Sequence, residues 1–178
     1  MKRYLTGVMY STLLILVATL AAPALAELAA PTFDEDDSTI RSMEALAKSI
    51  GTMDEEIGTE KKLLVADNMS LTDVEAKVFW PIYETYQKKL HQINKRLAKV
   101  INAYALEYKK GALLNETAKK LLDEALAIEL AEVKLKQSYV SKFGKAFPVA
   151  KVARYIQIET KMQSVLYHEL AGKIPLLE

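Results

Sequence analysis

The sequence predicts an all-α fold: a long antiparallel helical hairpin plus a third C-terminal helix, with short N-terminal helices before the hairpin. In the longest segment, apolar residues recur at alternating spacings of four and three, as they do on helix faces that pack together. No stretch of useful length alternates apolar and polar side chains as a half-buried strand does. The 178 residues include no cysteine, so the fold must be held by its own core.

Residues 1–26 have the layout of a cleavable secretory signal peptide. Two basic residues precede an apolar stretch, and Pro23 precedes the small-residue site Ala24-Leu25-Ala26. An uncleaved membrane anchor is the alternative, because the apolar stretch is nearly long enough to span a bilayer. The order of the parts favours cleavage, so we expect an exported protein with no stable membrane insertion after the signal is removed.

Charge is divided unevenly along the rest of the chain. Residues 27–60 carry ten acidic and two basic side chains, whereas residues 61–178 carry 13 acidic and 20 basic ones. We interpret 27–60 as an acidic, partly flexible segment and 61–178 as the helical domain. The split suggests a regulatory hypothesis in which the acidic segment folds back on the basic helices and screens them.

Two short helices are expected before the hairpin. In residues 39–50 apolar side chains fall at helical spacing, and residues 59–68 are also compatible with a helix. Gly51 and Gly58 are expected to break the helical stretch between them.

The longest helix is predicted over residues 72–109. Thr72 followed by Glu75 forms a capping box, Pro81 is expected to bend the third turn, and Gly111 is a plausible stop. Its apolar seam is Phe79, Tyr83, Tyr86, Leu90, Ile93, Leu97, Val100 and Tyr104.

The next helix, about 116–144 with Asn115 as its cap, has apolar residues on two faces. One face holds Leu121, Ile128, Leu135, Tyr139 and Phe143, and the other holds Leu122, Leu126, Leu130, Val133 and Val140. Such a helix lies between two partners, either a third helix or a second subunit. Pro148 fits the first position of the last helix, about 149–171, which ends at Gly172 and Pro175.

The segment Leu71-Thr72-Asp73-Val74-Glu75 resembles the Leu-Thr-x-x-Gln motif of the Spy/CpxP family of periplasmic helical proteins. Phe147-Pro148-Val149 is similar to that family's second motif, and Phe79-Trp80-Pro81-Ile82-Tyr83 looks like an aromatic–proline block found in a subgroup. The resemblance covers about residues 69–170. It implies a periplasmic, ATP-independent chaperone or envelope-stress adaptor, and a homodimer shaped like a cradle.

An unfolded or partner protein of the envelope is then expected to bind to basic and apolar side chains of the long helices. The candidate binding residues are Lys88, Lys89, Lys95, Arg96, Lys99, Tyr104, Tyr108 and Lys109. The alternative is that these lysines are simply a solvated helix face and that the tyrosines belong to the core.

The sequence contains no motif for catalysis or for a cofactor. It lacks a Gly-x-Ser-x-Gly elbow, a phosphate-binding glycine loop and a His-Glu-x-x-His motif. The acidic pairs Asp123-Glu124 and Glu129-Glu132 are interpreted as salt-bridging surface positions. We therefore expect no enzyme activity and no cofactor, and the near-neutral charge of residues 27–178 argues against nucleic acid as a partner.

Two other functions stay open at this point. The chain would be a dedicated partner-binding protein if it docks on one folded protein, such as the outer domain of a sensor. A metal-responsive sensor would have to use His168 and Glu169, because lysines surround His91 and disfavour a divalent cation there.

Overall fold

The computed structural model describes residues 37–52, 57–111 and 113–176. All of them belong to one of the two units into which the chain divides, Phe33–Glu178. The predicted signal peptide and the first ten residues of the acidic segment lie outside the described residues.

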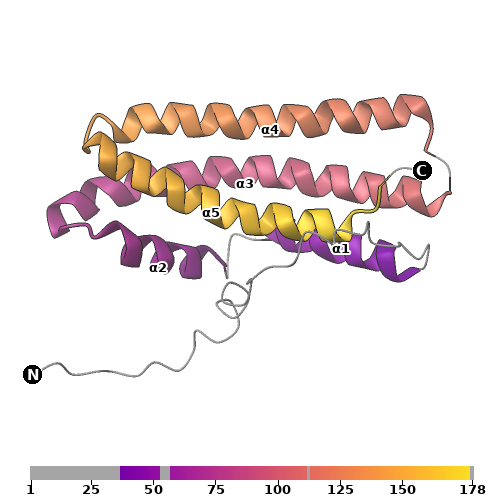
Figure 1. Cartoon of the computed structure of the whole chain (residues 1–178), viewed down its shortest axis with the longest axis horizontal. Coiled ribbons are helices and arrows are strands. Elements are labelled where there is room, and N and C mark those ends of the chain that lie inside the picture. The colour runs from indigo at the N-terminus through magenta and orange to yellow at the C-terminus, as the bar shows by residue number, and fades with distance from the viewer. Residues whose placement is uncertain (1–36, 53–56, 112, 177–178) are drawn as a thin grey trace, which may run out of the picture. The chain divides into compact units, whose positions relative to one another are not determined.

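The described residues form helices and no strand, which confirms the all-α prediction (Figure 1). The helices are α1 (Asp37–Thr52), α2 (Ile57–Met69), α3 (Asp73–Lys109), α4 (Asn115–Phe143) and α5 (Val149–Lys173). α3 and α4 pack against each other as the predicted hairpin, and α5 packs on α4, α2 and α1. α1 packs mainly on α3.

The predicted capping box opens α3. The Glu75 backbone N–H donates to Thr72 Oγ1 at 3.3 Å, and the Thr72 backbone N–H donates to Glu75 Oε2 at 2.9 Å. The helix then continues through Pro81 to Lys109. It ends as predicted, because Gly111 has a φ of 70°, a left-handed conformation that glycine adopts without steric cost.

Other predicted helix ends are wrong by a residue or more. Gly51 and Gly58 lie inside α1 and α2 rather than between helices. A Cβ added at Gly51 would lie 3.7 Å from Ala98 Cβ, so the last turn of α1 lies close to α3 at this glycine. Leu114, not Asn115, is the N-cap of α4, and α5 runs past Gly172 to Lys173.

The core has two parts. The larger is an aromatic cluster between α3, α4 and α5, in which the Phe79 ring lies 5.2 Å from the Tyr155 ring and 5.1 Å from the Phe143 ring. The smaller joins α1 to the second half of α3 and to the end of α5. Its buried members are Ile40, Met43, Leu46, Ala47, Ile50, Ala98, Ile101, Ala105 and Leu170.

The side chains of the seam predicted along α3 are more deeply buried in its first half than in its second. Phe79, Tyr83, Tyr86 and Leu90 are buried, but the later seam residues from Ile93 to Tyr104 are half-buried. There the most buried side chains are those of Ala98, Ile101 and Ala105, which share a core cluster with α1. The acidic segment thus contributes α1 to the core through apolar packing.

Candidate functional site: an exposed apolar row on α4 and basic residues of α3

The two apolar faces of α4 have different environments. On one face Ile128, Leu135, Tyr139 and Phe143 are buried against α3 and α5. On the other face the apolar side chains remain 43–59% exposed to solvent. We call these five residues the α4 row: Leu122, Leu126, Leu130, Val133 and Val140.

None of the five side chains belongs to either core cluster of the described residues. The members of the α4 row are three to seven residues apart and so share one side of the helix over about five turns. Large apolar side chains scattered singly on a surface are ordinary, but five on one side of a helix are typical of a surface that binds another molecule.

Basic side chains lie where α4 packs against α3. Lys142 Nζ lies 4.2 Å from the centre of the Tyr139 ring, and Lys89 Nζ of α3 lies 5.9 Å from the same ring. Arg96 Nε of α3 donates to Glu124 Oε1 of α4 at 2.8 Å, and this contact raises the pKa of Arg96 and lowers the pKa of Glu124. Lys89 and Arg96, two of the predicted binding residues, thus help to join the hairpin.

The remaining basic residues of the prediction project from α3 into solvent. Lys88, Lys95 and Lys99 are exposed and lie at spacings of seven and four residues, which places them on one side of the helix. Lys109 is exposed near its C-terminal end. They form a solvated basic stripe, and this is compatible both with binding of an acidic partner and with the simpler interpretation as a solvated helix face.

The structure does not place the two predicted tyrosines with that stripe. Tyr104 and Tyr108 are half-buried and pack against the cluster around α1. The Tyr104 hydroxyl donates to the carbonyl oxygen of Pro175 at 3.0 Å, and burial raises the pKa of this tyrosine. Tyr104 therefore joins the segment after α5 to α3.

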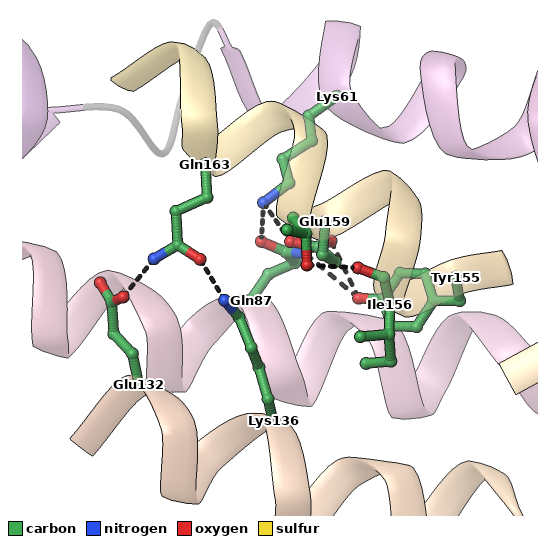
Figure 2. A network of polar contacts seen from close by, with 9 residues as sticks. Lys61, Gln87, Glu132, Lys136, Tyr155, Ile156, Glu159 and Gln163 are labelled. Atoms are coloured by element: carbon green, nitrogen blue, oxygen red, sulfur yellow. Dashed lines mark hydrogen bonds and ion pairs between the residues drawn. The ribbon is translucent and has the colours of Figure 1, made fainter. Parts of the chain in front are cut away.

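A buried polar network holds α4 to α5 behind the row. Figure 2 shows Gln163 of α5 between Glu132 and Lys136 of α4, donating to the carboxylate and accepting from the ammonium group. The Tyr167 hydroxyl donates to Glu132 Oε2 at 2.9 Å. Glu132 is only 4% exposed, so the interpretation of Glu129-Glu132 as a surface pair is wrong for Glu132. Burial raises the pKa of Glu132 above its ordinary value.

A second network centres on Glu159 of α5, which is buried between α2 and α3 (Figure 2). Its carboxylate accepts from the Gln87 side-chain amide at 2.6 Å and from the Tyr155 hydroxyl at 3.0 Å. Lys61 Nζ of α2 lies 2.9 Å from the other carboxylate oxygen. Sequence reasoning missed this site, although a glutamate four residues after Tyr155 on the apolar side of a helix is a signal for it.

Comparison of the chain with family models, with curated proteins and with solved structures finds no match. Among the described residues no helix is long and apolar enough to span a bilayer. The same part of the chain contains no group of three or more acidic, histidine or cysteine side chains that could hold a metal ion. His91 is buried in α3 and His168 is exposed on α5.

Proposed function

We propose that this protein is an ATP-independent chaperone or stress adaptor of the periplasm, which binds unfolded or partner proteins through the outer surface of its helical hairpin. The observation that carries the proposal is the α4 row, whose apolar side chains face solvent while the opposite face of the same helix fills the core. An apolar row can hold an unfolded segment without any catalytic group.

The basic stripe of α3 supplies the second part of the proposed surface. Exposed lysines attract acidic segments over distances of about 10 Å at moderate salt, which speeds encounter more than it tightens binding. The layout of residues 1–26 supports export, and the resemblance of the α3 opening to the Spy/CpxP motif supports the periplasm. Both supports come from the sequence.

The first experiment is light scattering of a heat-unfolded acidic test protein, with and without this protein and with no nucleotide. We expect suppression of aggregation at near-equal molar ratio. The variant Leu126→Gln/Leu130→Gln should lose most of that suppression. Val149→Gln/Val165→Gln is the matched control, because these two α5 side chains are 82% and 57% exposed but lie outside the row.

No suppression at any ratio would contradict the chaperone proposal. A pulldown from envelope extract dominated by one folded protein, and abolished by the same row variant, would then favour the dedicated partner-binding function. If the row instead joins two copies of this chain, light-scattering mass will show a dimer that Leu126→Gln/Leu130→Gln dissociates.

A further inference from the structure

The charge on α4 changes sign along the α4 row. Residues 116–129 carry four acidic and two basic side chains. Residues 130–145, which are the second half of α4 and the start of the turn after it, carry one acidic and four basic ones. The acidic residue of this second stretch is Glu132, which is buried against α5. The solvent-exposed charge near the row is therefore mainly acidic in the first half of α4 and basic in the second.

The basic side chains of the first half already have partners there. Lys119 Nζ lies 2.5 Å from Asp123 Oδ2, and Lys120 Nζ lies 2.7 Å from Glu116 Oε1. These pairs neutralise charge within one turn of the helix.

Glu129 of the first half and Lys134 of the second are both exposed. Among the described residues no ion pair includes either of them. Glu129 directly precedes Leu130 and Lys134 directly follows Val133, and successive residues are about 100° apart around a helix axis. The two charges therefore border the row on opposite sides and can pair with a bound molecule.

The row favours a helix as the bound segment. The backbone donors and acceptors of α4 are used within α4, so the row offers a bound segment no backbone hydrogen bonds. An extended segment would press unpaired backbone N–H and C=O groups against apolar side chains, which is costly, whereas a helix pairs these groups internally. Apolar side chains at three- and four-residue steps on a second helix also match the steps of the row.

The charges define the direction of such a helix. Its acidic side chains must lie beside the basic second half of α4, and its basic side chains beside the acidic first half. Acidic residues also stabilise the first turns of a helix and basic residues the last turns, because of the helix dipole. Both conditions are met when the bound helix runs antiparallel to α4.

We propose that the α4 row binds an amphipathic helical segment, antiparallel to α4, that carries acidic residues in its N-terminal half and basic residues in its C-terminal half. This inference rests on the proposed function, and it names the class of client or partner segment that the row binds. It differs from the role proposed for the basic stripe of α3, which attracts acidic segments of any conformation.

The test uses two fluorescent synthetic peptides with the same composition and the same apolar seam. One has acidic residues in its first half and basic residues in its second, and the other has the reverse order. Binding to this protein is followed by fluorescence anisotropy. We expect the first peptide to bind roughly tenfold more tightly at low salt, and the ratio of the two affinities to shrink as salt is added.

A charge reversal in the protein removes the effect of peptide helicity, because the peptides stay the same. Glu129→Lys/Lys134→Glu should bring the ratio of affinities to about one or below it. Lys161→Glu on α5 is the matched control, because Lys161 is exposed but lies on another helix, and the ratio should be retained.

Equal affinities of the two peptides, or a ratio that Glu129→Lys/Lys134→Glu leaves unchanged, would overturn this inference. If the same preparation still suppresses aggregation of an unfolded protein, the proposed function stands and only this inference fails. Because α4 itself has this order of charges, a second copy is the competing occupant. A dimeric light-scattering mass that excess of the first peptide does not reduce would assign the row to that second copy and overturn the inference.

Discussion

Lys61 Nζ lies 2.9 Å from Glu159 Oε2, and the two ends of this ion pair differ in their access to water. The Lys61 side chain is 19% exposed, whereas the Glu159 side chain is 2% exposed. Gln87 joins them, because its carbonyl oxygen accepts from Lys61 at 2.8 Å and its amide donates to Glu159 at 2.6 Å (Figure 2). The pair thus fastens α2 to α3 and α5 at one point.

We expect an asymmetric double-mutant cycle for this pair. Lys61→Met leaves a buried carboxylate without a cation and should lower the free energy of unfolding by about 3 kcal/mol. Glu159→Gln should cost less, because Lys61 can turn toward water and the new amide oxygen can still accept from Tyr155. The double variant should be more stable than Lys61→Met alone, as measured by urea unfolding. Equal and additive losses from the two single changes would contradict this account.

The buried carboxyl of Glu132 predicts a pH dependence of opposite sign to the usual acid denaturation. Burial raises its pKa above the ordinary 4.5, and the opposing effects of Tyr167, Lys136 and Gln163 are smaller. A carboxyl with a higher pKa in the folded state binds its proton more tightly when folded. Its contribution to stability is therefore lost as the pH rises from 4.5 through the raised pKa.

The variant Glu132→Gln isolates this contribution from the other carboxyl groups. The glutamine oxygen can accept from Tyr167 and Gln163, but it never ionises. We expect the variant to have a higher melting temperature than the parent at pH 7, and the difference to disappear below pH 4.5. A difference that stays constant with pH would show that packing, not ionisation, causes it.

The sequence predicted correctly those features of the fold that depend on a few adjacent residues. The capping box at Thr72 and the glycine stop at Gly111 are properties of a few adjacent residues, and both are confirmed. After Leu90 the predicted seam residues Ile93, Leu97 and Tyr104 still pack against the core but are only half-buried, whereas Ala98 becomes buried because α1 packs on it. The spacing of apolar residues along one helix does not show which other helix will pack against it.

The candidate site was predictable in part for the same reason. The two-faced pattern of α4 is visible in the sequence, and the structure shows which face is covered. The separation of Tyr104 from the lysine stripe, and the burial of Glu159 under α2, depend on contacts between residues about 70 or more apart in the chain. No local pattern encodes those pairings.

Two glycines predict stability changes of opposite sign. Gly51 lies within α1, and an added Cβ would make ordinary van der Waals contact with Ala98. Gly51→Ala should therefore raise the free energy of unfolding by about 0.5–1 kcal/mol. Gly111 has a φ of 70°, so Gly111→Ala should lower it by about 1 kcal/mol. Thermal unfolding of both variants, followed by circular dichroism, checks this. A loss of stability in Gly51→Ala would mean that the contact between α1 and α3 leaves no room for a methyl group at this position.

Because the two faces of α4 differ in exposure, we expect substitutions on the exposed face to affect binding and substitutions on the buried face to affect stability. Ile128 is 1% exposed and Leu126 is 54% exposed, although they are only two residues apart. Ile128→Ala removes buried methyl groups and should lower the free energy of unfolding by about 2–5 kcal/mol. Leu126→Gln should change the free energy of unfolding by no more than about 0.5 kcal/mol, because its side chain already faces water.

Suppression of client aggregation should respond in the reverse order. Leu126→Gln should weaken it, and Ile128→Ala should retain it at temperatures where that variant stays folded. If Leu126→Gln leaves suppression intact while Ile128→Ala abolishes it in the folded state, the α4 row is not the binding surface.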